Sequence, residues 1–239
     1  MRSKSEFWRI VAGLVLFAVA FGYVEAAVVM YLRSIYVPLH AQFYPALSAS
    51  ELFPLFSLDQ LRSLGPEHTA RLNVELGREF ATLLMLSGVA LATARKPREW
   101  IGAFLLCFGF WDIAFYLFLR LFLHWPASLL TWDVLFLLPV PWVGPVIAPI
   151  LVSLSMIVAA LAWLWREYSD KPFHLTRMRW GLILLGGMTV FVAFIYDFPN
   201  TASGGIPNAF RWDIFFVGEA IALLAFATAT STEKSERIK

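Results

Sequence analysis

Long apolar runs alternate with short polar segments along this chain. A membrane-spanning helix needs about 20 mostly apolar residues. Six segments meet that requirement, at residues 8–32, 76–94, 100–123, 146–165, 180–197 and 212–230. No change in composition marks a second domain between them. The pattern therefore predicts an all-α, polytopic transmembrane helical bundle in which residues 1–239 form a single transmembrane domain of about six spanning helices.

The first apolar segment has two interpretations. Basic residues precede it, and Ala18-Val19-Ala20 resembles a signal-peptidase site. The apolar run nevertheless continues to Leu32, a length that favours a retained spanning helix. The alternative is a cleaved signal followed by five remaining helices.

Prolines interrupt the apolar pattern between residues 132 and 149. One helix from Trp132 to Trp165 would be about 51 Å long, whereas the hydrocarbon core measures about 30 Å. Proline also breaks a helix interior because it lacks a backbone donor. We therefore expect residues 133–145 to form a broken or re-entrant segment on the outer side, which packs on the bundle or lines a cavity.

The long loop at residues 33–66 contains a helix-start signal. Ser57 and Gln60 have the spacing of an N-terminal cap, and Gly65 marks a helix end. This predicts a short interfacial helix on the outer membrane surface. Pro66 then suits the first turn of the second spanning helix.

The distribution of basic residues predicts the orientation. With the N-terminus inside, 13 of the 19 basic residues fall on the cytoplasmic side, as the positive-inside rule requires. We therefore expect a multi-pass protein of the cell (inner) membrane with both termini cytoplasmic. Only 15% of residues are charged and the net charge is +2, so nothing in the composition indicates a nucleic-acid partner.

Acidic residues gather on the opposite side. Eleven of the 17 carboxylates lie in or beyond the outer half, and the positive-inside rule does not explain them. Glu25, Asp112 and Glu219 are the deepest, and Asp112 lies about 18 Å from the inner end of its helix. A carboxylate at the bilayer centre costs about 2.5–3.5 kcal/mol on insertion scales. Such residues usually face the bundle interior and pair, bind a cation or hold a proton.

The second spanning helix carries a polar stripe at helical spacing. Its members are His68, Arg71, Glu75, Arg78, Glu79 and Thr82. Glu75 and Glu79 are one turn apart and close enough to share a metal ion or a proton. A salt-bridge ladder through Arg71 and Arg78 is the simpler alternative. In the next helix, Asp112, Tyr116 and Arg120 repeat the spacing, and Tyr116 could donate a hydrogen bond.

The leading functional interpretation is a cation-handling membrane protein. Several carboxylates with few histidines favour a divalent metal ion such as Mg²⁺, Ca²⁺, Mn²⁺ or Fe²⁺, or protons alone. Arg78 and Arg120 would balance the charge. The carboxylates that we expect to converge on this outer-half site are Glu25, Glu75, Glu79, Asp112 and Glu219.

Two other functional classes stay open. The first is a membrane enzyme that acts on a lipid or quinone-like substrate, with Glu75, Glu79, Asp112 and Tyr116 as candidate catalytic residues. It predicts a lipid-sized cavity that ends at the carboxylates. The second is a non-catalytic subunit of a homo-oligomer or membrane complex. The apolar inner halves of the helices count against a transport path, and no nucleotide-binding or zinc-protease motif is present.

Overall fold

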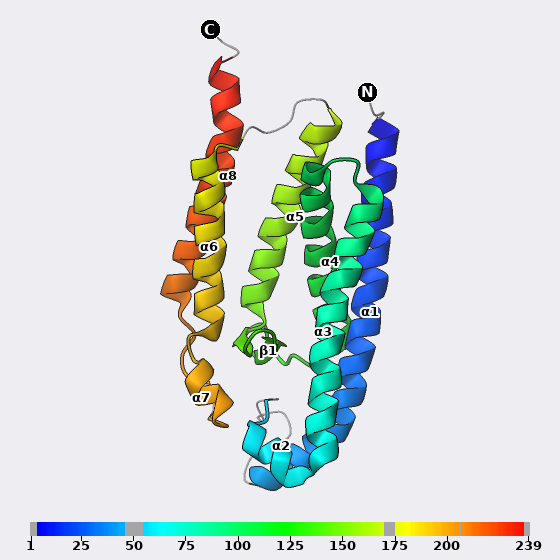
Figure 1. Cartoon of the computed structure of the whole chain (residues 1–239), viewed down its shortest axis with the longest axis vertical. Coiled ribbons are helices and arrows are strands. Elements are labelled where there is room, and N and C mark those ends of the chain that lie inside the picture. Colours follow the sequence, from blue (N-terminus) through cyan, green and yellow to red (C-terminus); the bar gives the residue numbers. More distant parts are fainter. Residues whose placement is uncertain (1–3, 46–54, 170–174, 206, 237–239) are drawn as a thin grey trace.

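The computed structural model describes residues 4–45, 55–169, 175–205 and 207–236, with side chains of the last helix described to residue 228. Its long helices stand side by side (Figure 1). They are α1 (Lys4–Phe43), α3 (Pro66–Thr93), α4 (Pro97–Leu123), α5 (Ile147–Tyr168), α6 (Arg177–Ile195) and α8 (Trp212–Glu236). Two short helices, α2 (Leu58–Leu64) and α7 (Phe198–Ala202), lie at the end away from the marked termini. The predicted all-α transmembrane bundle is confirmed.

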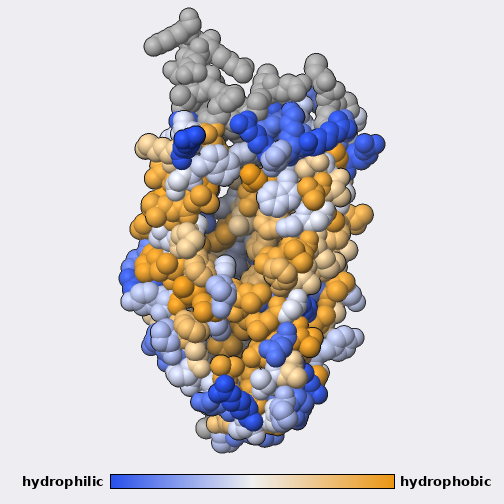
Figure 2. Space-filling model, viewed as in Figure 1, coloured by the Kyte–Doolittle hydropathy of each residue, from blue (hydrophilic) through white to orange (hydrophobic). Residues whose placement is uncertain are grey.

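The surface is that of a membrane protein. Within the described residues, five helices (α1, α3, α4, α5 and α6) are long and apolar enough to cross a bilayer. α8 corresponds to the sixth predicted segment and packs along α6. Figure 2 shows a mainly apolar middle, with hydrophilic residues gathered toward the two ends. The chain is therefore an integral membrane protein.

Helix α1 is longer than the apolar pattern predicts. It continues from the apolar run to Phe43, and its 40 residues span about 60 Å. That is about twice the thickness of a hydrocarbon core. The extension carries polar residues that pack against other elements instead of ending the helix, since His40 is buried and Arg33 is largely covered.

The predicted short helix between residues 57 and 65 is confirmed as α2. The Gln60 backbone N–H donates to Ser57 Oγ at 3.2 Å, and the Ser57 N–H donates to Gln60 Oε1 at 2.9 Å. These two bonds satisfy donors that a helix start leaves without partners. Gly65 follows with a φ of 128°, which favours glycine, and Pro66 occupies the first turn of α3 as expected.

The proline-rich segment forms a β-hairpin. Strand β1 (Trp132–Phe136) pairs antiparallel with β2 (Trp142–Pro145), and Asp133 lies opposite Gly144. Pro139 lies in the connection, where its missing donor costs no ladder hydrogen bond. The segment predicted to be broken or re-entrant is therefore a hairpin, which lies between the end of α4 and the start of α5.

Close helix contacts depend on small residues. A Cβ atom on Gly22 of α1 would lie 2.9 Å from the carbonyl oxygen of Trp111 in α4. A Cβ atom on Gly109 of α4 would lie 2.7 Å from the Ser153 carbonyl in α5. Helix α4 is thereby fixed between α1 and α5, and it places its polar residues at a defined height in the bundle.

Candidate functional site

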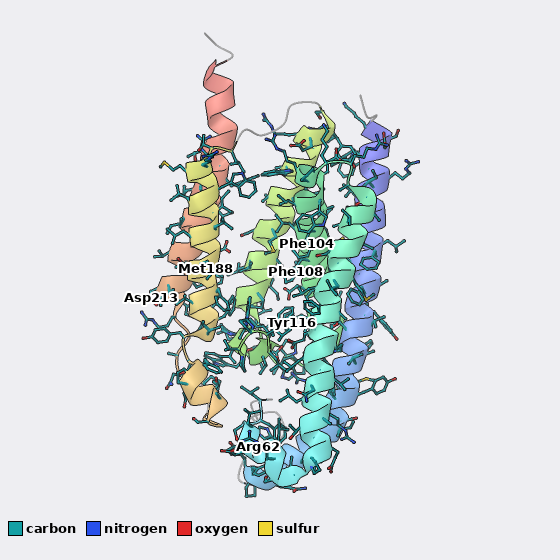
Figure 3. The ribbon with its side chains drawn as sticks, viewed as in Figure 1. Arg62, Phe104, Phe108, Tyr116, Met188 and Asp213 are labelled. Carbon is teal, nitrogen blue, oxygen red and sulfur yellow. The ribbon has the colours of Figure 1, made fainter. Side chains whose placement is uncertain are left out.

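A cavity of about 810 Å³ lies at the end of the molecule away from the termini. It is bounded by the parts of α1, α3 and α4 that lie away from the termini, by the hairpin and by α2 and α7. In Figure 3, Tyr116 lies near the hairpin and Arg62 lies on α2 at the far end. Both residues line the cavity, so it extends between these two levels.

Helices α1 and α3 supply most of its polar lining. They run antiparallel, so residues early in one face residues late in the other. Each helix presents one polar stripe, and the whole stripe predicted on α3 lines the cavity. The residues concerned are Glu25, Arg33 and His40 of α1 and His68, Arg71, Glu75, Arg78, Glu79 and Thr82 of α3.

Arg78 joins two of the carboxylates. Its guanidinium forms ion pairs with Glu25 of α1 and with Glu75 one turn away on α3. Thr82 Oγ1 also donates to Glu25 Oε2 at 3.2 Å. The salt-bridge alternative therefore holds for Glu75 and Arg78, and it extends to a second helix. The guanidinium of Arg78 therefore lies between Glu25 and Glu75, in the position that a metal ion bound by both carboxylates would need.

Glu79 has a different partner. Both of its carboxylate oxygens accept from the backbone N–H of Leu137, at 3.1 and 2.8 Å. The residue is buried, and no cationic side chain of the described chain lies within 4 Å of it. Glu79 thus fixes the hairpin connection against α3, and the charge of neighbouring Arg78 attracts it without forming an ion pair within 4 Å.

Asp112 is buried in the middle of α4. Ser153 Oγ of α5 donates to its Oδ2 at 2.8 Å. In the described part of the chain, no lysine, arginine or histidine forms an ion pair with it. A buried carboxylate without a paired cation is costly, so this group either carries a proton or meets a partner from the cavity.

Another buried carboxyl comes from the hairpin. Tyr116 donates to Asp133 Oδ2 at 3.2 Å, and Arg33 Nη2 donates to Oδ1 at 3.3 Å. The Arg33 guanidinium lies 3.5 Å from the centre of the Trp125 ring. Burial raises the pKa of Asp133 to about 6, although the charge of Arg33 acts in the opposite direction. Asp133 was not among the predicted site residues.

Two of the residues that were predicted to belong to the site lie outside the cavity lining. Glu219 is on α8, where it accepts from Ser155 Oγ of α5 at 2.8 Å, and it does not line the cavity. Arg120 donates to the carbonyl oxygens of His124 and Pro126 at the end of α4, and it does not line the cavity either. The structure brings together Glu25, Glu75, Glu79, Asp112, Tyr116 and Arg78.

Several cavity-lining side chains carry polar atoms without a partner. Buried polar atoms in proteins are usually hydrogen-bonded, and exceptions require an explanation. Among the described residues, four such nitrogens belong to residues of this lining: Arg33 Nε, His40 Nε2, His68 Nδ1 and Trp111 Nε1. These nitrogens are covered by surrounding protein atoms, so a ligand in the cavity would reach them only through a rotation of their side chains.

A metal-ion site does not emerge from these contacts. Within the described ranges, no three side chains of histidine, cysteine, aspartate and glutamate come together in a way that could hold a metal ion.

Comparison with protein-family models, with curated proteins and with solved structures finds no match to this chain.

Proposed function

We propose that this protein binds a lipid-like or quinone-like amphiphile in the outer cavity, and that Glu79 and Asp112 exchange protons with its polar part. The distribution of basic residues supports an orientation with cytoplasmic termini, so the cavity would open on the extracytoplasmic side of the cell membrane. The protein would then be a membrane enzyme or ligand-binding protein of that surface.

The observation that carries the proposal is a cavity that has both apolar walls and a group of polar and charged side chains, some of which have incomplete hydrogen bonding. Its volume of about 810 Å³ is within the range of about 300–1,000 Å³ for small-molecule sites. Side chains such as Val29, Leu72, Leu76, Phe115 and Leu135 supply the apolar part. An amphiphile matches this combination because it offers both kinds of surface.

Unequal carboxyl environments support acid–base chemistry. Glu79 accepts two hydrogen bonds from one backbone N–H, whereas Asp112 accepts one from a hydroxyl. Enzymes that use two carboxyls commonly separate their protonation behaviour by environment. Tyr116, bonded to Asp133, adds a hydroxyl on the same side of the cavity.

The packing of the other half of the bundle supports a ligand that enters and leaves the cavity from one side of the membrane only. Below the cavity, the interfaces of α1, α3 and α4 are filled by buried apolar residues, including Leu14, Ala18, Leu86, Ala90 and Leu106. A polar solute would have to cross this packed layer to reach the other end. A catalytic or binding role therefore fits the cavity better than transport.

A cation or proton site at Glu79 and Asp112 is the second candidate. It is favoured by the lack of an ion pair at either carboxyl in the described chain. Metal content of purified protein, wild type beside Glu79→Gln, tests it. Stoichiometric divalent metal that is lost in the variant would favour this candidate, and metal-free wild-type protein after reconstitution would contradict a metal site.

Two tryptophan substitutions on α3 test the amphiphile proposal. Leu72 lines the cavity, whereas Val74 is two residues away and 72% exposed. We expect wild-type protein to co-purify with a stoichiometric amphiphile, measured by native mass spectrometry and lipid extraction. Leu72→Trp should reduce its occupancy at least about tenfold by filling the cavity, and Val74→Trp should not.

Equal retention in both variants would contradict the proposal, because bound lipid would then be annular. The proposal would also be wrong if the wild-type protein retained no amphiphile under conditions in which it keeps its folded structure.

A further inference from the structure

Acidic residues predominate at one end of the cavity and basic residues at the other. Glu25, Glu79 and Asp112 lie toward the membrane, near the hairpin. Along α3 the stripe then continues outward through Arg71 to His68. From Glu79 to Arg71 is eight residues, or about 12 Å along the helix axis. The cavity therefore has a mainly acidic end near the hairpin, where Arg33 and Arg78 are paired with carboxylates, and a mainly basic end near α2, where Asp59 is paired with Arg62.

Arg71 makes no ion pair or hydrogen bond with any other described residue. It lines the cavity and is exposed there. The neighbouring Arg62 of α2 contrasts with it, since Arg62 pairs with Asp59 at 3.2 Å. The outer end thus holds one guanidinium whose five donors are available for an anion.

Two histidines also line the cavity: His40 of α1 and His68, which lies one turn before Arg71 on α3. His40 is 4% exposed and His68 is 7% exposed, and each has one ring nitrogen without a hydrogen-bond partner. Tyr36 and Phe56 connect the two rings, because His40 lies 4.4 Å from Phe56 and His68 lies 5.7 Å from Tyr36 between ring centres.

Two carboxylates lie nearby and are already in contact with basic groups. Asp59 is the partner of Arg62, and Glu67 Oε1 lies 3.6 Å from His68 Nε2. Glu67 is not part of the cavity lining. Neither forms an ion pair with Arg71, and Glu75, one turn further along α3, is paired with Arg78. No carboxylate of the described residues therefore neutralises Arg71 through an ion pair.

We infer that the outer end of the cavity is a subsite for a phosphate group, formed by Arg71, His40 and His68. A planar guanidinium and imidazole donors are the groups that bind phosphate oxygens in proteins. The inference rests on the proposed function and refines it, because the amphiphile would carry a phosphate at its outer end. The part of the ligand about 12 Å deeper would then meet Glu79.

The test compares three probes on the full chain in neutral detergent at constant ionic strength. The probes are monododecyl phosphate, dodecanol and inorganic phosphate, and the readout is the probe concentration that half-saturates the increase in Tm. We expect monododecyl phosphate to bind most tightly. Arg71→Gln should weaken its binding at least about tenfold, and Arg71→Lys should weaken it less.

The charge-matched control is Lys96→Gln, which removes one positive charge from an exposed residue at the other end of the bundle. It should leave the binding of monododecyl phosphate unchanged. Because Arg71 has no described partner, Arg71→Gln should keep the wild-type Tm without a probe. His40→Gln offers a second variant of the same subsite should that Tm be lowered.

The outcomes separate the two proposals. Equal binding of dodecanol and monododecyl phosphate, with no effect of Arg71→Gln or His40→Gln, would overturn the phosphate subsite and leave the amphiphile cavity standing. Arg71-dependent binding of inorganic phosphate as tight as that of monododecyl phosphate would support the subsite and contradict a lipid ligand. No stabilisation of the wild type by monododecyl phosphate would overturn the subsite.

Discussion

Arg78 is the residue on which the charge balance of the cavity depends. It forms ion pairs with Glu25 and Glu75 from two different helices, and its side chain is 22% exposed. Removing one partner of a largely buried ion pair leaves the other charge without compensation. Arg78 therefore connects the chemistry of the site to the stability of the α1–α3 interface.

We predict that Arg78→Gln lowers the free energy of unfolding by about 2–3 kcal/mol, because two largely buried carboxylates lose their cation. Thermal unfolding in detergent should show a Tm lower by roughly 5–10 °C. Arg62→Gln is the matched control, since the Arg62–Asp59 pair is exposed and should contribute less than about 1 kcal/mol. Equal effects of the two substitutions would contradict the role given to Arg78.

Part of the site could be predicted from the spacing of individual residues along the sequence. Helical spacing placed six polar residues on one stripe of α3, and that stripe lines the cavity. Spacing along one helix does not reveal partners on another, so the pairing of Glu25 with Arg78 could not be read from it. Asp133 was missed because its contact with Tyr116 depends on the fold of the hairpin. An acidic residue inside an apolar, proline-rich segment was the available signal.

At the scale of elements, α7 is held in place by one carboxylate. Asp197 accepts from the side-chain amides of Asn200 and Asn208, at 3.0 and 2.7 Å, and from the Asn208 backbone N–H at 2.9 Å. Partial burial raises the pKa of Asp197, but these hydrogen bonds outweigh that effect and hold the pKa below its ordinary value. Helix α7 lines the cavity through Phe198 and Ala202.

A lowered pKa in the folded state means that Asp197 stabilises this segment above its unfolded pKa of about 4. The contribution is lost as the pH falls below that value through the folded pKa. We expect hydrogen exchange in residues 198–205 to accelerate below about pH 4 relative to the helices. In Asp197→Asn the segment should exchange faster at neutral pH, and its acid dependence should disappear. An unchanged acid dependence in the variant would contradict this role.

Helices α6 and α8 form a pair through two glycines. A Cβ atom on Gly186 would lie 2.6 Å from the Gly218 carbonyl oxygen, and a Cβ atom on Gly218 would lie 2.7 Å from the Gly186 carbonyl oxygen. Neighbouring Gly187 has no atom within 4 Å of its added Cβ. The closeness of this pair therefore depends on residue size at two positions.

We predict that Gly186→Ala separates the pair and costs about 1–3 kcal/mol through overpacking. Gly187→Ala is the control one residue away, and it should leave stability unchanged or raise it by up to about 1 kcal/mol. Thermal unfolding of the two variants measures the difference. Equal Tm values would show that the helices can move apart without cost.

The sequence predicted elements more reliably than their ends. Apolar runs marked the spans, and capping residues located α2 and the start of α3. The extension of α1 to Phe43 was not predicted, because Arg33 and His40 look like loop residues until tertiary packing covers them. The prolines indicated a broken segment, but the pairing of Asp133 with Gly144 in a hairpin depends on contacts that local propensity does not encode.

At the scale of the whole molecule, the orientation proposed from the basic residues has a direct test. Cys107 is buried and is the single cysteine of the chain, so Cys107→Ala provides a background for labelling. We expect Arg62→Cys to react with a membrane-impermeant maleimide in intact cells. Lys96→Cys, at the opposite end, should react after permeabilisation. The reverse labelling pattern would show that the cavity opens on the cytoplasmic side, and it would overturn the proposed orientation.

The unusual length of α1 has a mechanical consequence. Helix α1 forms one wall of the cavity, at Glu25 and Arg33 before Pro38 and at His40 after it. Its first turns meet α5, where Phe7 lies 5.1 Å from Trp165 and 5.6 Å from Tyr168 between ring centres. The part of α1 before Pro38 contains no interior proline and resists bending, so it connects the cavity wall at Glu25 and Arg33 rigidly to the first turns of the helix. A tilt of the cavity wall would therefore displace Phe7 from its aromatic contacts with α5.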